Sequence, residues 1–264
     1  MLLNAFPGFD CHIHSHFSDG CESLDTMART AAGRGLAGVV FTDHMPLPFE
    51  NRYALVHRRL DAYRTEIQAV RQRMSGRLQV LMGLEMEVLP SHTDWSREIA
   101  EGPWDVLIAS VHQVERAGRR YIINGTAAEF AEALETGFGG DIRRLCSAYY
   151  RQSIAMVATG WFRILGHLDV LGKHNRNGRF FDESAPWYRE LVAELLAAVE
   201  RAGMVVEINT GGLDHAVRST YPGARILATI AARGIPVCLS SDAHRPEEVA
   251  RHFERFPTVP QQAA

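Results

Sequence analysis

The sequence lacks the features that mark secreted, zinc-finger and membrane proteins. Its four cysteines, Cys11, Cys21, Cys146 and Cys238, form no C-x-x-C pair, which argues against a disulfide framework and against a zinc finger. No apolar run reaches the roughly 18 residues that a membrane span needs, and the first residues do not show the charged-then-apolar pattern of a signal peptide. We therefore expect a reduced, cytoplasmic protein that has no membrane partner.

A marked excess of either charge is also missing. The 28 basic and 31 acidic residues give a net charge of -3, and the lysines and arginines do not cluster. Binding to long nucleic acids relies on basic patches, so we expect no such partner. The length of 264 residues suits one α/β barrel as well as two small domains. The sequence does not indicate an oligomeric state.

Seven short apolar segments, rich in β-branched residues and followed by polar ones, predict buried parallel strands. They are residues 8–13, 37–42, 79–85, 106–111, 164–168, 205–209 and 237–241. Helical patterns alternate with them, at residues 24–34, 53–74, 91–101, 126–134, 141–159, 187–202, 221–233 and 246–253. Each crossover must return on the same side of the sheet, so the alternation implies a parallel α/β sheet. We expect one barrel-like domain over residues 1–264.

Polar residues follow nearly every predicted strand. The first strand leads into His12, His14 and His16, which alternate with other residues and so point to one face of an extended chain. Other strand ends carry histidine or a carboxylate, at His44, Glu85, His112, His167, Asp169, Glu207, Asp242 and His244. In parallel α/β barrels these ends form the active-site face. Because mixed imidazole and carboxylate sites bind Zn, Fe or Mn, the pattern predicts a metal-dependent enzyme.

The ordered motifs resemble the PHP (polymerase and histidinol phosphatase) superfamily of metal-dependent phosphoesterases. They are His12-Ile13-His14 with Asp19, Thr42-Asp43-His44, Gly83-Leu84-Glu85, Ser110-Val111-His112, Gly166-His167-Leu168-Asp169 and Ser241-Asp242-Ala243-His244-Arg245-Pro246. In detail, the chain is most similar to the histidinol-phosphate phosphatase branch. The resemblance implies a distorted (β/α)7 TIM-like barrel that holds three divalent metal ions.

The resemblance also implies a role for each strand-end residue. The three groups of metal ligands would be His12, His14, Glu85 and Asp242; Glu85 with His112 and His167; and Asp19, His44 and His244. The implied reaction is the hydrolysis of L-histidinol phosphate to L-histidinol and phosphate, in histidine biosynthesis, by attack of a metal-bound hydroxide on phosphorus. His44 and Asp242 are two candidate routes for protonating the leaving oxygen.

Candidate substrate contacts are less sharply marked. Lys173 stands where the phosphatase branch tends to carry a basic residue, so it is a candidate phosphate contact. The Gly-Leu-Arg of the family reads Gly-Leu-Asp at Asp214, and Arg218 is a possible replacement for the missing arginine. Asp214 or Glu50 would suit the ammonium group of the substrate. His16 points either into the pocket or into a solvated loop.

Two other functions fit parts of the pattern. One is a PHP phosphoesterase that acts on another small phosphomonoester or on a nucleotide. The other is a metal-dependent amidohydrolase, whose barrel also begins with His-x-His but normally uses a carbamylated lysine or a lone strand-end aspartate. Glu85 on the third strand and the Asp242-Ala243-His244 motif favour the PHP interpretation. A non-catalytic barrel would have lost ligands, and none is missing.

Overall fold

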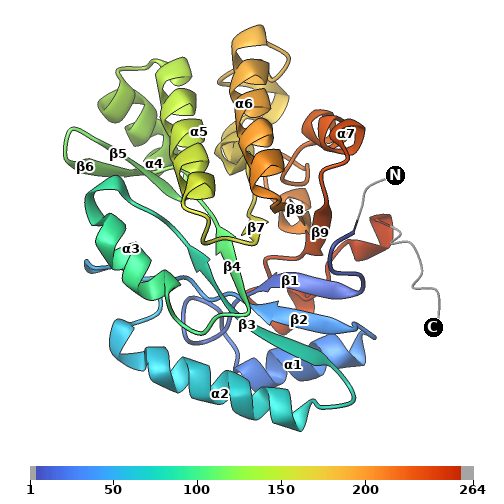
Figure 1. The fold of residues 1–264 in the computed structure, drawn as a ribbon. Coiled ribbons are helices and arrows are strands. Elements are labelled where there is room, and N and C mark those ends of the chain that lie inside the picture. Colours follow the sequence, from blue (N-terminus) through green and yellow to red (C-terminus); the bar gives the residue numbers. More distant parts are fainter. Residues whose placement is uncertain (1–3, 257–264) are drawn as a thin grey trace.

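A computed structural model describes residues 4–256, which are built around a sheet of seven parallel strands (Figure 1). The strands are β1 (Phe9–Ile13), β2 (Gly38–Phe41), β3 (Gln79–Met86), β4 (Val106–Ala109), β7 (Ile164–Leu165), β8 (Val205–Asn209) and β9 (Val237–Ser240). They are hydrogen-bonded in chain order. Parallel bridges from Asn4 to Val237 and from Ile13 to Ala243 bring β1 beside β9. The sheet is therefore a nearly closed barrel, as the sequence predicted.

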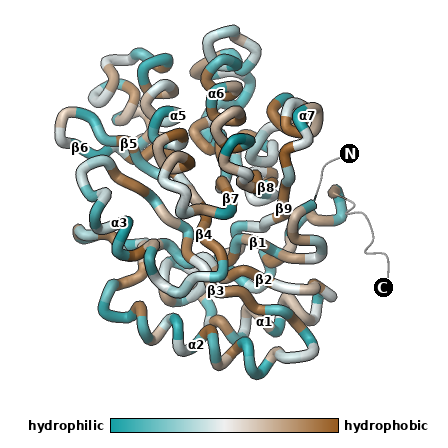
Figure 2. Tube along the Cα trace, in the orientation of Figure 1, coloured by the Kyte–Doolittle hydropathy of each residue, from teal (hydrophilic) through white to brown (hydrophobic). Residues whose placement is uncertain are grey.

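The interior of the barrel is filled by apolar side chains below the strand ends. One buried cluster takes members from β1, β2, β4, β7, β8 and β9, namely Cys11, Val40, Val106, Ile108, Ile164, Val205 and Cys238. A larger apolar cluster packs the outer faces of the strands against the helices. Figure 2 shows the resulting pattern, with hydrophobic strands at the centre and mixed hydropathy along the surrounding helices.

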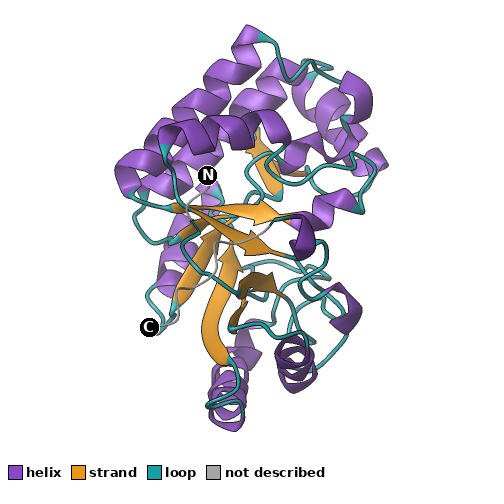
Figure 3. Cartoon of the chain, turned by 90° about the vertical axis from the view of Figure 1, so that its right-hand side faces the viewer, coloured by secondary structure: helices purple, strands orange, loops and turns teal. Residues whose placement is uncertain are grey.

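The α-helices of residues 4–256 surround the strands (Figure 3). They are α1 (Leu24–Gly33), α2 (Leu60–Arg73), α3 (Thr93–Ala100), α4 (Ala127–Glu132), α5 (Ile142–Ala158), α6 (Pro186–Ala202) and α7 (Ala224–Arg233). Local sequence explains two of the helix ends. Ser23 caps α1 by accepting a hydrogen bond from the Thr26 N–H, and α6 ends at Gly203, whose φ of 63° favours glycine. None of the described helices combines the length and the apolar character that a membrane crossing requires.

The predicted helix over residues 246–253 is wrong. The segment contains the 3-10 turn Pro246–Glu248, and a second turn, Phe253–Arg255, follows it. Polar groups here bond to the barrel: Glu248 accepts from the His244 N–H, and Asp10 accepts from the Ala250 N–H. These contacts compete with the hydrogen bonds of a helix, so the segment instead ties β1 to the loop after β9.

Other helices begin at different residues than the sequence pattern predicted. The helix expected from residue 53 begins at Leu60, after the 3-10 turn His57–Arg59. The helix expected from residue 221 begins at Ala224, because the backbone of Tyr221 pairs with that of Asn209. The sequence also did not predict the antiparallel hairpin of β5 (Gln113–Arg116) and β6 (Arg119–Ile122). This hairpin extends directly from the strand end that carries His112.

Candidate metal centre

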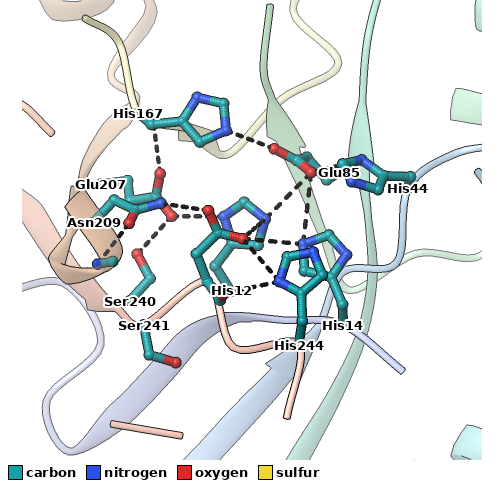
Figure 4. A network of polar contacts seen from close by, with 12 residues as sticks. His12, His14, His44, Glu85, His167, Glu207, Asn209, Ser240, Ser241 and His244 are labelled. Atoms are coloured by element: carbon teal, nitrogen blue, oxygen red, sulfur yellow. Dashed lines mark hydrogen bonds and ion pairs between the residues drawn. The ribbon is translucent and has the colours of Figure 1, made fainter. Parts of the chain in front are cut away.

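The nine predicted metal ligands lie together at the carboxyl ends of the strands. They are His12, His14, Asp19, His44, Glu85, His112, His167, Asp242 and His244, and most are drawn in Figure 4. A cavity of about 380 Å³ opens over this cluster, and His12 and His14 lie fully buried beneath it. The barrel therefore brings residues from both ends of the chain to one site.

Glu85 occupies the centre of the cluster, with its side chain only 1% exposed. Its Oε1 lies 3.0 Å from Nε2 of His112 and 2.9 Å from Nε2 of His167. Its Oε2 faces a different set of imidazoles, at 2.8 Å from Nδ1 of His44, 3.4 Å from Nε2 of His12 and 3.7 Å from Nε2 of His14. A carboxylate whose two oxygens face two sets of nitrogens has the arrangement of a bridging ligand.

Asp242 adds a second carboxylate beside the first histidines. Its Oδ1 lies 3.3 Å from Nε2 of His14 and 3.8 Å from Nε2 of His12. Its Oδ2 accepts a hydrogen bond from the side-chain amide of Asn209 at 3.1 Å. The backbone of Asp242 has a φ of 53°, which a non-glycine residue adopts at a cost of about 1 kcal/mol. Such local strain is common where function fixes the direction of a side chain.

Asp19 gathers a further set of imidazoles at the open side of the cluster. Its Oδ1 lies 3.3 Å from Nε2 of His244 and 3.6 Å from Nδ1 of His14. Its Oδ2 lies 3.6 Å from Nε2 of His44. His44 thus turns one ring nitrogen toward Glu85 and the other toward Asp19, and His14 is shared in the same way between Asp242 and Asp19. The distances alone do not divide the nine residues into the three separate groups that the resemblance implies.

The chemistry of the cluster fits divalent metal ions. Nε2 of His12 and Nε2 of His14 are buried and have no hydrogen-bond partner, although both face carboxylates. Two ligand atoms that each lie about 2.1 Å from a shared ion are roughly 3.0–3.5 Å apart. Most of the nitrogen–oxygen separations given above fall near that range. In the described part of the chain, three groups have their ligand atoms within 4.8 Å of one another, namely His14 with Asp19, His44 and His244; His12 with His14 and Glu85; and His44 with Glu85 and His112.

When no metal is bound, the carboxylates and most of the imidazoles favour each other's charged forms. Burial disfavours the ionised carboxylates, but the surrounding imidazoles hold the pKa of Glu85 and that of Asp242 well below their usual values. Burial likewise disfavours imidazolium, yet Glu85, Glu207 and Asp242 raise the pKa of His12. His14 behaves differently, because burial and the neighbouring His244 and His44 lower its pKa to about 4. Metal ions at this site would therefore compete with protons for several of the histidines.

Three buried carboxylates accept hydrogen bonds from ligand residues or from the loop between two ligands. Glu207 accepts a hydrogen bond from Nδ1 of His12 at 2.6 Å. Asp43 accepts hydrogen bonds from the backbone N–H and hydroxyl groups of both Ser15 and Ser18, which fixes the loop between His14 and Asp19.

Glu87 is the third of these carboxylates, and it accepts a hydrogen bond from the His112 N–H at 2.8 Å. Asp43 lies within one of the sequence motifs and Glu207 is one of the strand-end carboxylates, but no role was predicted for Glu87 from the sequence. Alternation along β3 was the available signal, because Glu87 lies two residues after Glu85.

Asp169 lies two residues after His167 but does not form a hydrogen bond with a ligand imidazole. Its Oδ2 accepts a hydrogen bond from the Gly223 N–H at 2.8 Å, just before α7 begins. Nδ1 of His167 is buried without a partner. Asp169 therefore fixes the segment before α7, and burial raises its pKa to about 7.

The four predicted substrate contacts do not lie together in the structure. Lys173 lines the metal cavity, and its Nζ donates to the Asn124 carbonyl at 2.6 Å. The chain turns at Arg218, which has a φ of 56°, and Arg218 lines a neighbouring cavity of about 720 Å³. Asp214 is bound to Nε2 of His252 at 2.9 Å and faces Arg251, and His16 packs against Phe17. Of the four, only Lys173 is among the residues that line the metal cavity.

Arg251 is a cationic neighbour of the site that the sequence missed. It lines the metal cavity, as does Arg245, and its guanidinium donates to the Ser241 and Asp242 carbonyls. A Cβ atom on Gly211 would lie 2.5 Å from Nη2 of Arg251, so glycine leaves the room for this side chain. No local signal marked Arg251, because it lies in the segment that was predicted to be a helix.

Comparisons with known proteins agree with the geometry. The family model described as the PHP domain matches residues 10–211. A protein of Deinococcus radiodurans named "Probable histidinol-phosphatase" is 32% identical over 92% of this chain and 89% of its own length. The histidinol-phosphatase of Bacillus subtilis is 27% identical over 94% of this chain and 97% of its own length.

Solved structures agree as well. The histidinol phosphate phosphatase (HisK) of Lactococcus lactis, in complex with zinc, L-histidinol and phosphate, has a TM-score of 0.70 and 25% identity and covers 90% of this chain and 87% of its own. A HisK structure from Listeria monocytogenes has a TM-score of 0.85 over 94% of this chain and 100% of its own. At 20% identity, this second likeness supports the fold alone.

Proposed function

The chain belongs to the PHP domain family, and from this membership we propose that it is a metal-dependent phosphatase of L-histidinol phosphate, releasing L-histidinol and phosphate. The observation that carries the proposal is the position of Glu85, whose two oxygens face separate sets of buried imidazoles. Histidinol-phosphatases similar over most of their length, and a related structure that holds zinc, L-histidinol and phosphate, support the substrate. The amidohydrolase alternative is not supported, because the matched family is a different one.

We assign the metal sites to the nine clustered residues and propose three divalent ions, of zinc, iron or manganese. When bound, such ions supply positive charge for the phosphoryl oxygens and lower the pKa of a water molecule toward 7. Glu85, Asp19 and Asp242 provide the negative charge that balances part of the ions. The relative with bound zinc makes zinc the first ion to test.

Cationic side chains complete the phosphate end of the cavity. Lys173, Arg245 and Arg251 line the same cavity as the metal cluster, and cations bind phosphate oxygens through charge-assisted hydrogen bonds. Burial lowers the pKa of Lys173. The Nη2 group of Arg251 is tied to the Asp242 carbonyl at 3.2 Å, so this arginine connects the phosphate end with a metal ligand. We propose that Arg251 takes the role that the sequence had offered to Arg218.

His44 and Asp242 line the cavity and are the two candidate proton donors to the leaving oxygen. 4-Nitrophenyl phosphate needs no such donor, because its leaving group is stable as an anion. A variant that lacks the donor, H44Q or D242N, should therefore lose turnover of L-histidinol phosphate while keeping more of its turnover of 4-nitrophenyl phosphate. The variant of the other residue should lose both activities in parallel.

Phosphate release by the zinc-loaded protein tests the function directly. L-histidinol phosphate is compared with a panel of sugar, nucleoside and amino-alcohol phosphates. We expect kcat/KM for L-histidinol phosphate to exceed every other value by about 100-fold or more, the range that a site with specific polar contacts reaches. A flat profile, or a maximum on another ester, would retain the phosphatase chemistry and overturn the substrate. No hydrolysis of any ester would overturn both.

A further inference from the structure

A second, smaller cavity adjoins the metal centre and is not accounted for by the metal ligands. It has a volume of about 260 Å³, and it shares Asp19, His44, His112 and Asn124 with the metal cavity. The rest of its wall includes Tyr53, Ile122 and Glu129. These come from the segment before α2, from β6 and from α4, and Figure 1 shows β5, β6 and α4 on one side of the barrel. A group bound at the metals can therefore continue into this cavity.

Part of the second cavity is apolar. Ile122 is 38% exposed, and among the described residues only Val56 is another large hydrophobic residue of comparable exposure. Tyr53 is half-buried, with its ring edge-on to His44 at 5.1 Å between centroids. An exposed isoleucine beside a tyrosine ring offers contact area for a flat ring such as imidazole.

Glu129 brings a negative charge that does not belong to the metal cluster. Its Oε2 accepts two hydrogen bonds from Thr126, at 2.7 Å from the backbone N–H and at 2.8 Å from the hydroxyl. Both bonds lower the pKa of Glu129, and Lys173 adds to the effect. Within residues 4–256, no lysine, arginine or histidine nitrogen forms an ion pair with Glu129, and its carboxylate accepts both of its hydrogen bonds at Oε2. The carboxylate is thus ionised, held in place and open to a cation at Oε1.

We propose that Glu129 is a specificity-determining residue that binds the ammonium group of the substrate while the phosphate lies at the metal centre. The inference rests on the proposed function, because it takes the substrate to carry a phosphate and an amine. Apart from Asp19, which belongs to the metal cluster, Glu129 is the one carboxylate among the residues that line the second cavity. Asp214, which the sequence offered for this role, is instead paired with His252.

The competing explanation is that Glu129 only caps α4. Thr126 and Glu129 form a complete capping box, in which the Thr126 hydroxyl also accepts from the Glu129 N–H. Glutamine serves in the same motif, so E129Q keeps the cap and removes the charge. Glu132 is the matched control, because it lies on the same helix and pairs with Arg119 at the surface.

The experiment compares wild type, E129Q and E132Q on two substrates. One is L-histidinol phosphate, and the other is 3-(imidazol-4-yl)propyl phosphate, which lacks the amine. We expect E129Q to lower kcat/KM for L-histidinol phosphate by roughly 10- to 100-fold, mainly through KM, since a hydrogen bond to a charged group is lost. Turnover of the amine-free ester should stay within about twofold, and E132Q should behave as wild type.

Binding of L-histidinol gives a readout that does not depend on turnover. Titration calorimetry with the zinc-loaded protein should show Kd for L-histidinol raised in E129Q by the same factor as KM. An equal loss of kcat/KM on both esters would show that Glu129 acts only as the cap of α4, and it would overturn the inference. Unchanged kinetics and unchanged Kd in E129Q would overturn it as well. Failure of wild type to hydrolyse either ester would instead refute the proposed function, and the inference with it.

Discussion

Glu207 accepts a hydrogen bond from Nδ1 of His12 at 2.6 Å, and both side chains are fully buried. In the metal-bound protein this contact would hold the proton of His12 on Nδ1 and leave Nε2, which faces Glu85 and Asp242, free to bind an ion. The Ser240 hydroxyl also donates to Glu207, at 2.6 Å. A carboxylate that orients a ligand imidazole in this way raises its basicity toward metal.

Glu207 should therefore strengthen the binding of metal by His12. Replacing Glu207 with glutamine, as E207Q, should weaken zinc binding by about 10- to 100-fold, the usual effect of losing a carboxylate behind a ligand histidine. Competition with a chromophoric chelator measures the affinity. E200Q is the control, because Glu200 pairs with Arg233 far from the site. Equal zinc affinity in wild type and E207Q would show that the contact does not tune His12.

Glu85 should be required for both metal binding and turnover. E85A removes the carboxylate that faces His112 and His167 on one side and His44 on the other. We expect a loss of bound metal, measured by elemental analysis after gel filtration, and a fall in kcat of about 1,000-fold or more. Wild-type turnover in this variant would refute the assignment of Glu85 as a bridging ligand.

Asp43 should matter for stability more than its single charge suggests. It accepts from the Ser15 and Ser18 N–H groups at 2.9 and 3.0 Å, and from both hydroxyls. D43A leaves the buried donors of Ser15 and the partly buried donors of Ser18 without this acceptor, so we expect the free energy of unfolding in urea to fall by about 2–4 kcal/mol. The same substitution at the 96% exposed Asp94 should change it by less than about 0.5 kcal/mol. Similar values for the two variants would contradict the prediction.

Asp10 should give the protein a distinctive dependence on pH. Burial raises its pKa to about 6, from 3.8, against the hydrogen bonds from Ser241 and Ala250 that favour the charged form. Because the folded state binds this proton more tightly, the contribution of Asp10 is fully present below about pH 4 and is lost as the pH rises through 6. At about 1.4 kcal/mol for each pH unit, the loss is about 3 kcal/mol.

The comparison of wild type with D10N isolates this effect. The free energy of unfolding is measured for both metal-free proteins between pH 4 and 8, so that metal release does not intrude. The free energy of unfolding of wild type minus that of D10N should decline as the pH rises to about 6 and then level off. A difference that stays constant over the whole range would show that Asp10 does not titrate in this way.

The fold and the metal cluster were predictable because their signals are local. Each strand is a short apolar run, and each of these ligands lies near or just after the end of its strand. The order of His12, Glu85, His112 and Asp242 along the chain therefore already fixes their order around a parallel barrel. The structure brings all nine predicted ligands together. How they divide among ions remains a proposal.

The parts that were missed depend on contacts between distant segments. Arg251 reaches the metal cavity through bonds to the Ser241 and Asp242 carbonyls, which no periodicity reveals. The sequence pattern of the segment that contains Arg251 predicts a helix. In the structure, the backbone of this segment instead donates a hydrogen bond to Asp10. No role was predicted for Glu129 from the sequence, because the role that we propose for it depends on a cavity lined in part by the β5–β6 hairpin, which was not predicted.

The contact between β1 and β9 has a consequence for how the protein is made. Asp10 accepts hydrogen bonds from Ser241, 231 positions later, and His12 and His14 lie beside Asp242. A chain emerging from the ribosome therefore exposes its first histidines long before Asp242 and His244 are synthesised. Contacts of such sequence separation form late, because closing the long loop between them is costly in entropy. The cluster of predicted ligands is therefore complete only when β9 and the residues that follow it have docked beside β1.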